Sequence, residues 1–450
     1  MKNNKILAII LSILWISSVS YGQNESNMSL INNFNDLMIA LQSGQKQIVI
    51  GRNITCNHSL VLPEGVTLKG EPQENGELPM LLFRDSDGVG LTVDNSLVDI
   101  KINAPVDQRA IYTTVAKEDL GVLRMENLSV HGQISIITRI GVQSADIVLS
   151  NVDIIAADAR HYLEQPQKYG VNVLQGAFTV YNMNGDENSL VRVRATQLTV
   201  GRKDAPVLGS GIFIAGFGDQ GGRVEVSLLE TGAVHSTGKI PFGVADFITG
   251  GVFILNGAHA QEVVTNGELV TYGVNDMVTD VWGSVDNWTS NQPITSYGPS
   301  GIGFVNFGVV KNYTVNAPIQ TYGLGARGYN QYDGTVEHIS FKSIETFGDG
   351  SVGVQISREI GTLTIEEDLI THGSVGNTLV KGVIIQLPAY ALSIKEGGAA
   401  KSITIKGDVK TYGDDVTTII TEKGSEVKKI EIQGKVEAHG NNANTKLVDQ

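Results

Sequence analysis

Residues 271–294 read TYGVNDMVTDVWGSVDNWTSNQPI, and three further versions of this unit follow: SYGPSGIGFVNFGVVKNYTVNAPI (296–319), TYGLGARGYNQYDGTVEHISFKSI (321–344) and TFGDGSVGVQISREIGTLTIEEDL (346–369). Each unit begins with a hydroxyl residue, an aromatic residue and a glycine. The glycines recur every 25 residues, at Gly273, Gly298, Gly323, Gly348 and Gly373. A fixed period of roughly 20 to 50 residues is typical of a solenoid, whose coils bury their apolar faces by stacking on one another. The repeat therefore predicts a stack of coils.

Looser copies of the unit place Gly238, Gly413 and Gly440 at intervals of 35, 40 and 27 residues, and the longer intervals predict loop insertions. Short β-branched runs punctuated by Gly, Asn and Asp predict strands from Ile48 onward. One helix is expected at residues 33–43, because apolar residues recur at helical spacing in NNFNDLMIALQSG (32–44) before a terminating glycine. Neither the leucine template nor a period of 3.6 residues is present in the repeat, so leucine-rich and helical repeats are excluded.

The first residues predict export. Lys2 and Lys5 precede an apolar run, residues 6–16, and the small-residue segment SSVSYG (17–22), which is the pattern of a secretory signal peptide. The apolar run is shorter than the roughly 20 residues of a membrane-spanning helix, so we expect a secreted or periplasmic protein without a transmembrane segment. Cleavage after Gly22 leaves 31 of the 33 basic residues against 47 acidic ones, a formal net charge of −16. This charge disfavours nucleic acid as a partner, and acidic polysaccharides too unless a local basic cleft attracts them.

The sequence predicts no disulfide, metal site or cofactor. Cys56 is the single cysteine, and the eight histidines are scattered without the spacing of zinc ligands.

The repeat, the helix at 33–43 and the segment LPEGVTLKG (62–70) together resemble the right-handed parallel β-helix proteins, the superfamily that includes pectate lyases, many glycoside hydrolases and autotransporter passengers. The resemblance is architectural and covers residues 34–445. It implies an all-β, single-domain solenoid of about sixteen coils spaced about 4.8 Å apart, with the helix covering its open end. It also implies a frequent connection with carbohydrates. No catalytic signature carries over, because the pectate-lyase arginine and calcium-aspartate motif is missing, and fold alone does not define function.

The expected organisation has four parts. Residues 1–22 form the signal peptide, 23–47 the N-terminal capping segment, 48–440 the parallel β-helix and 441–450 a polar tail.

Residues 25 positions apart should lie almost directly above one another. One such column is an aromatic ladder at a corner, which we expect to be structural: Tyr272, Tyr297, Tyr322, Phe347 and His372. The glycine after each ring should supply a positive φ or a close approach between coils. A second column lies an even number of positions from the isoleucines expected in the core, so its side chains are expected to point inward as well. Its members are Trp288, Tyr313, His338 and Leu363.

A third column lies on the strand written TDVW, FVNF, YNQY and VQIS in successive units. Alternate residues of this strand point to opposite faces, and one of the two sets is expected to face outward: Asp280, Trp282, Val305, Phe307, Asn330, Tyr332, Gln355 and Ser357. Burying each of the polar members without a partner would cost about 1–3 kcal/mol. Facing outward, these acids, amides and rings would form a sugar-binding strip. The alternative is an internal amide ladder beside a stack of core aromatics.

Glycoside hydrolysis needs two carboxyl groups about 5 to 10 Å apart. Asp280 is the leading candidate acid, since contact with the Trp282 indole would raise its pKa. Asp333, two coils away, or Asp276 is the candidate ionised partner. The candidate substrate-binding residues are Trp282, Phe307, Asn330, Tyr332 and Arg358. Arg358 is also in register with Asp333, so a plain surface ion pair is the alternative.

Two segments interrupt the strand pattern and are expected to be long loops, residues 104–121 and 156–170. The second supplies possible cleft residues: Arg160, His161, Tyr162 and Glu164. Two function classes follow from these patterns. The favoured one is a secreted enzyme or binder acting on a neutral or weakly charged polysaccharide or oligosaccharide. The alternative is a structural or adhesin-like extracellular solenoid without catalysis.

Overall fold

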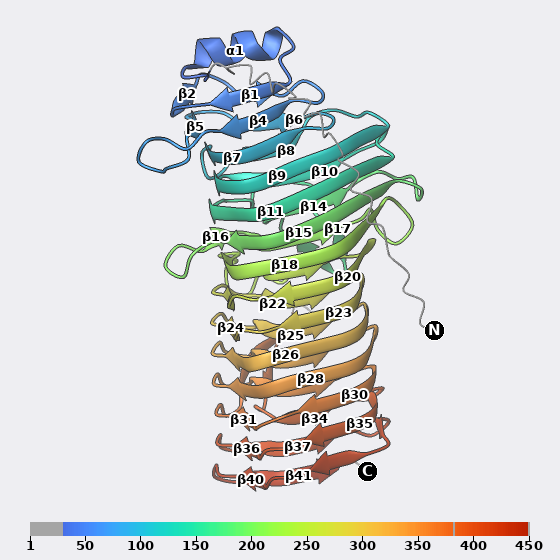
Figure 1. The fold of residues 1–450 in the computed structure, drawn as a ribbon. Coiled ribbons are helices and arrows are strands. Elements are labelled where there is room, and N and C mark those ends of the chain that lie inside the picture. The colour runs from blue at the N-terminus through green and yellow to red at the C-terminus, as the bar shows by residue number, and fades with distance from the viewer. Residues whose placement is uncertain (1–29, 381–382, 449–450) are drawn as a thin grey trace, which may run out of the picture.

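The computed structural model describes residues 30–380 and 383–448, so the expected signal peptide, residues 1–22, lies outside the described residues. The chain forms a right-handed parallel β-helix, in which strands from successive coils pair in parallel and stack along one axis (Figure 1). One α-helix, α1 (Phe34–Gln42), precedes the coils.

The first sheet wraps around a bend, because several coils contribute two or more strands to it. Its 23 strands are β1 (Gln47–Ile50), β2 (Ile54–Cys56), β4 (Thr67–Gly70), β5 (Met80–Phe83), β7 (Ser96–Asn103), β9 (Asp119–His131), β11 (Ser144–Ala156), β15 (Leu190–Val200), β16 (Val207–Leu208), β18 (Arg223–Thr237), β20 (Ala258–Thr265), β21 (Leu269–Thr271), β23 (Ser284–Ser290), β24 (Ile294–Ser296), β26 (Val309–Thr321), β28 (Thr335–Thr346), β30 (Glu359–Ile365), β31 (Leu369–Thr371), β35 (Ala399–Ile405), β36 (Val409–Thr411), β38 (Glu426–Val427), β39 (Ile430–Ile432) and β40 (Val436–Ala438).

The second sheet contributes one strand from each coil. These strands are β3 (Leu60–Val61), β6 (Val89–Leu91), β8 (Arg109–Thr113), β10 (Gln133–Thr138), β14 (Gly176–Asn182), β17 (Ser210–Ala215), β19 (Phe247–Ile254), β22 (Asp276–Val281), β25 (Ile302–Asn306), β27 (Arg327–Gln331), β29 (Val352–Ile356), β34 (Leu392–Ile394), β37 (Thr417–Thr421) and β41 (Asn444–Val448). The described residues thus form fourteen coils, fewer than the sixteen expected, because insertions lengthen several coils.

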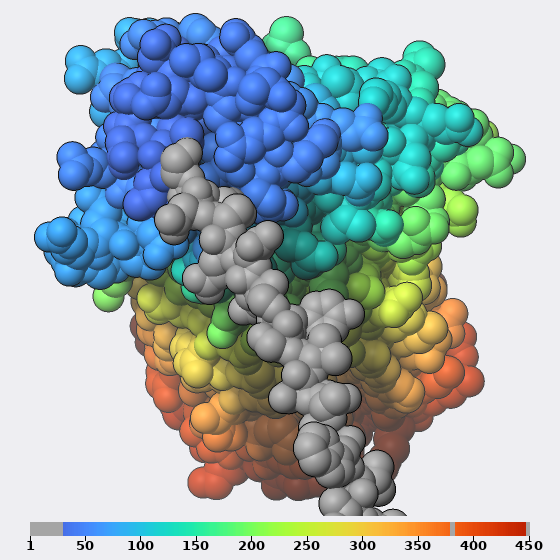
Figure 2. Space-filling model, turned by 45° about the horizontal axis from the view of Figure 1, so that its top comes forward, coloured from blue at the N-terminus to red at the C-terminus, as the bar shows by residue number. Residues whose placement is uncertain are grey.

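Helix α1 covers the N-terminal end of the stack, as the resemblance implies (Figure 1). The Asn33 side chain accepts a hydrogen bond from the Asp36 amide and caps the helix. Leu37, Ala40 and Leu41 are buried beneath it. Figure 2 brings this end forward and shows the N-terminal residues, in blue, gathered over it.

The repeat glycines stack in one line, as the 25-residue period predicts. A Cβ atom on Gly298 would collide with the carbonyl oxygen of Gly273, and one on Gly323 with that of Gly298. The same relation holds for Gly348 and Gly373. Close approach between coils, rather than a positive φ, therefore explains why glycine recurs there.

The inside of the coils is one continuous apolar core that runs from Ile31 to Ile419. Trp288 and Tyr313 lie in it with ring centroids 5.5 Å apart, as predicted. Phe304 stacks on Tyr313 at 3.6 Å, and Tyr329 stacks on Phe304 at 5.3 Å. The prediction that Phe304 of β25 and Tyr329 of β27 point into the core is therefore confirmed.

His338 does not point into the core, contrary to the expectation. Tyr313 pairs in register with Ile339, and His338 pairs instead with Asn312 at the exposed surface. The reason is one extra residue before β28, where the chain turns through Gly334 with φ +64.

Two boundaries also differ from the expectation. Residues 104–121 contain β8, a regular strand of the second sheet, and do not leave the solenoid as a long loop. Residues 444–448 of the expected polar tail form β41, which pairs in parallel with β37.

Candidate functional site

Two excursions leave the coils next to the outer face of the second sheet. The first follows β11 and contains β12 (Gln167–Lys168) and β13 (Val171–Val173), which form a short hairpin that we call the cap hairpin, residues 167–173. Its strand β13 pairs in parallel with β19. The second contains the hairpin of β32 (Gly376–Val380) and β33 (Val383–Leu387) and falls in the 40-residue interval where an insertion was expected.

The first excursion buries a second apolar cluster, separate from the core inside the coils. The cluster consists of Val173, Tyr181, Phe213, Ala215, Ile248, Phe253, Leu255 and Trp282. The strip inferred from strand alternation thus lies outside the inner core, but it is not open to solvent along its length. Asp280 is 0 % and Trp282 4 % exposed. Strand alternation predicts the direction in which a side chain points, but not what covers it. The segment that covers Asp280 and Trp282 lies more than 100 residues earlier in the chain.

Asp280 is an isolated buried carboxyl group. Its Oδ2 accepts a hydrogen bond from the Trp282 indole at 3.1 Å, while Oδ1 has no hydrogen-bond partner among the described residues. Burial raises the pKa of Asp280 well above its usual range. The direction is the one expected for a general acid, but the carboxyl group lies beneath the apolar cluster and away from solvent.

Asp276 connects the corners of two successive coils through hydrogen bonds. Its carboxylate accepts hydrogen bonds from the amides of Gly273 at 2.6 Å and Gly238 at 3.2 Å, and from the Thr249 hydroxyl. Burial outweighs these hydrogen bonds and raises the pKa of Asp276 to about 6. These contacts give Asp276 a structural role at the corner.

Asp333 and Arg358 form the ion pair that their register suggested, with 3.5 Å between Asp333 Oδ1 and Arg358 Nε. Both side chains are exposed, so the pair contributes under about 1 kcal/mol. Asp280, Asp276 and Asp333 therefore occupy three different environments: one beneath the cap, one at a corner and one at the surface.

Three of the expected substrate-binding residues do come together. Phe307 lies 5.9 Å from Trp282 and 4.7 Å from Tyr332 between ring centroids. Tyr169, at the tip of the cap hairpin, joins them at 4.5 Å from Phe307 and 5.3 Å from Trp282. We call these four rings the aromatic cluster. Asn330, the fourth expected residue, is buried and accepts a hydrogen bond from Gln355 at 3.3 Å.

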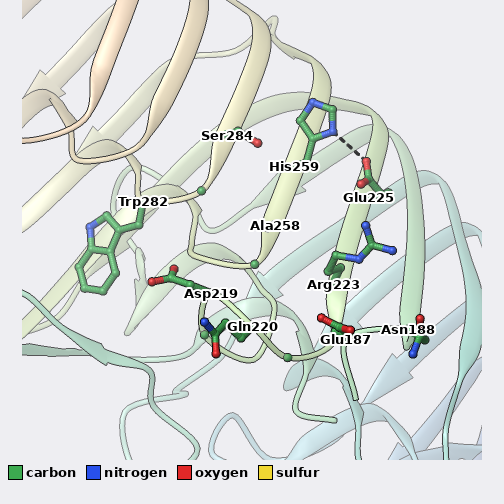
Figure 3. Close-up of a pocket in the computed structure, with 14 residues that line it drawn as sticks. Glu187, Asn188, Asp219, Gln220, Arg223, Glu225, Ala258, His259, Trp282 and Ser284 are labelled. Atoms are coloured by element: carbon green, nitrogen blue, oxygen red, sulfur yellow. Dashed lines mark hydrogen bonds and ion pairs between the residues drawn. The ribbon is translucent and has the colours of Figure 1, made fainter. Parts of the chain in front are cut away.

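A groove of about 620 Å³ opens beside the aromatic cluster, where the second sheet turns into the first (Figure 3). Trp282 borders it with its ring turned into the apolar cluster, and the turn between β17 and β18, residues 216–222, forms another wall. The other polar side chains that line it are Glu187, Asn188, Asp219, Gln220, Arg223, Glu225, His259 and Ser284.

Several ionisable side chains of the groove have a polar partner nearby. His259 Nδ1 lies 2.8 Å from Glu225 Oε2, the contact drawn in Figure 3, and its Nε2 lies 3.4 Å from Asp286. Asp286 in turn pairs with Lys311 at 2.7 Å. Asp219 pairs at 3.0 Å with Lys168 of the cap hairpin, so the hairpin and the groove wall are joined by an ion pair.

A second hollow of about 420 Å³ continues along the outer face of the first sheet and shares Glu225 with the groove. Arg192, Arg194, Ser227 and Gln261 line it. The two hollows follow successive coils, β11 to β23, and so run along the solenoid axis.

The residues predicted from segment 156–170 do not line the groove. Arg160 pairs with Asp158 at 2.7 Å, and Glu164 pairs with Arg139 at 2.6 Å. His161 and Tyr162 contact each other, with ring centroids 4.1 Å apart. The groove residues Glu187, Asp219, Glu225 and His259 were not predicted, because they lie on irregular coils before the regular repeat begins.

The fold and groove define the class of protein, a parallel β-helix with a lateral polar groove that ends at aromatic rings. Comparison with known proteins adds no narrower assignment, because no family model, curated protein or solved structure matches the chain. Within residues 30–380 and 383–448, no group of three or more His, Cys, Asp or Glu side chains could hold a metal ion. In the same residues, no helix is long and apolar enough to cross a membrane.

Proposed function

We propose that the protein is an exported β-helix protein that binds a neutral glycan in the lateral groove. The position of Trp282 carries this proposal, because this residue borders the groove while its buried ring joins the aromatic cluster, whose Tyr169, Phe307 and Tyr332 rings are partly exposed. Binding sites for small organic ligands typically combine apolar and aromatic walls with a few placed polar groups. Flat rings suit the apolar faces of sugars, and the amides and carboxylates of the groove suit their hydroxyls. The signal-peptide pattern in residues 1–22 supports export.

The charge balance favours a neutral ligand and binding over cleavage. Asp219 pairs with Lys168, and Glu187 and Arg223 carry opposite charges, so the groove offers no strong excess of one charge for an ionic substrate. Hydrolysis needs one protonated and one ionised carboxyl group on either side of the bond. Asp280, whose pKa is raised, lies beneath the cap and does not supply the first of these from the groove.

A panel of neutral oligosaccharides tests the proposal by calorimetric titration of the mature protein. The double variant Glu187→Gln with Gln220→Ala alters two exposed groove residues, and we expect at least tenfold weaker binding, equivalent to about 1.4 kcal/mol. Tyr412→Ala is the matched control, since Tyr412 is an exposed ring far from the groove. The absence of binding to every sugar, or equal losses in the groove and control variants, would contradict the proposal.

One observation favours the structural solenoid as the second candidate. Eight rings stack coil on coil along one corner: His235, Tyr272, Tyr297, Tyr322, Phe347, His372, Tyr412 and His439. Because the rings face one another, they present their edges to solvent and strengthen the stack. A protein that binds no glycan but resists unfolding through this ladder would fit that class.

A further inference from the structure

Arg327 is a buried cation on the outer face of β27. Its side chain is 6 % exposed. On the two preceding coils its place is taken by Met277 and Ile302, and on the next coil by Val352. The guanidinium therefore stands in a column that is otherwise apolar in this part of the stack.

The guanidinium has weak partners. Its Nε donates to Gln355 Oε1 at 3.5 Å, and its Nη1 donates to the carbonyl oxygen of Gly325 at 3.4 Å, both at the long end of the hydrogen-bond range. Among the described residues, no carboxylate forms an ion pair with it. Desolvation lowers the pKa of Arg327 to about 10. A buried charge without a counter-ion is unfavourable, so an anion bound beside this guanidinium would stabilise it.

Further hydrogen-bonding groups lie on the same strands and on the neighbouring hairpin. Asn330 and Gln355 lie on the same outer face and are hydrogen-bonded to each other at 3.3 Å. Thr378, in the β32–β33 hairpin, donates to the same Gly325 carbonyl oxygen at 3.1 Å, so the base of this hairpin lies beside Arg327. Asp280 is in register with Asn330, not with Arg327, and lies two coils, about 10 Å, from Asn330. It is hydrogen-bonded to Trp282 instead.

We propose that Arg327, with the side-chain amides of Asn330 and Gln355, forms a binding site for the carboxylate group of a small organic acid or an acidic sugar. The planar guanidinium matches a carboxylate with two parallel hydrogen bonds. One guanidinium neutralises one negative charge, whereas a phosphate dianion would leave excess negative charge in a chain whose net charge is already −14. The site is separate from the groove residues and does not rest on the proposed glycan function.

Thermal unfolding of the mature protein with added acetate, glucuronate, glucose or sulfate tests the proposal at constant ionic strength. We expect a saturable rise in Tm with acetate or glucuronate and none with glucose. A stronger response to glucuronate than to acetate identifies a sugar acid as the source of the carboxylate, and the reverse identifies a simple organic acid. A parent protein whose Tm does not respond to either carboxylate overturns the proposal, as does a larger response to sulfate.

Arg327→Met reproduces the residue found two coils earlier at Met277 and is the decisive variant. It should abolish the response to carboxylate and, without ligand, should unfold at or above the parent Tm, because the uncompensated charge is removed. A marked fall in Tm without ligand would show that the guanidinium is a structural element and would overturn the proposal. Gln355→Leu leaves the charge in place and should raise the apparent Kd for the carboxylate about tenfold; an unchanged Kd excludes the amide contribution that we propose.

Discussion

Tyr169 stacks on Phe307, 138 positions later in the sequence, with 4.5 Å between their ring centroids, and its hydroxyl donates to the Phe307 carbonyl oxygen at 3.3 Å. This contact fastens the tip of the cap hairpin to the outer wall of the coils. Tyr169 adopts a φ of +55, a conformation that is unusual for a bulky residue. Its aromatic contacts therefore offset local backbone strain and keep the cap in place over Trp282.

Removing this contact should uncover Trp282. In Tyr169→Ala, two ring contacts are lost, each contributing about 0.5–1.5 kcal/mol. We expect increased quenching of Trp282 fluorescence by acrylamide in a Trp288→Phe background of residues 23–450, where Trp282 is the single tryptophan. Tyr412→Ala in the same background is the control. Equal quenching in both variants would show that Tyr169 does not hold the cap.

The stability of the protein should depend on pH through Asp276. Burial raises the pKa of this group from 3.8 to about 6, so the folded state binds its proton more tightly than the unfolded state does. Its contribution is therefore present below pH 4 and is lost as the pH rises through 6, by about 3 kcal/mol. Denaturant unfolding of parent and Asp276→Asn between pH 4 and 7 measures this, and a parent-minus-variant difference that stays constant or grows with pH would contradict it.

Trp288 and His338 should respond differently to truncation, although the repeat places them in one column. Trp288 is packed against Tyr313 in the core, so Trp288→Ala should lower the free energy of unfolding by about 3–5 kcal/mol. His338 is exposed, so His338→Ala should change it by less than about 0.5 kcal/mol. Chemical denaturation of both variants measures the difference, and similar losses would mean that the column is continuous after all.

A methyl group should not be tolerated in the glycine line. In Gly323→Ala the new Cβ would meet the Gly298 carbonyl oxygen, and overpacking of this kind costs about 1–3 kcal/mol. Gly185→Ala is the control, since a Cβ there meets no atom within 4 Å and its φ is not positive. Thermal unfolding should separate the two variants by about 1–3 °C; coincident transitions would mean that the coils can move apart at little cost.

The sequence by itself determined that the chain forms stacked coils, that the coils consist of β-strands, and in which direction most side chains point. The 25-residue period and the period-two alternation within strands depend on contacts between adjacent coils, and the coils between Gly273 and Gly373 repeat them regularly. Phe304 and Tyr329 could be assigned to the core in this way. The same reasoning failed at His338 because one inserted residue reverses the assignment of every side chain until the register is restored.

The tertiary structure alone decided what covers the outer face and where the groove opens. Asp280 and Trp282 were oriented correctly but were expected to be open to solvent, and the cap hairpin that covers them belongs to a segment without repeat pattern. The contact of Tyr169 with Phe307, and of Lys168 with Asp219, joins residues far apart in the chain. Such contacts depend on how an irregular excursion folds back on the solenoid, and no local periodicity encodes that path.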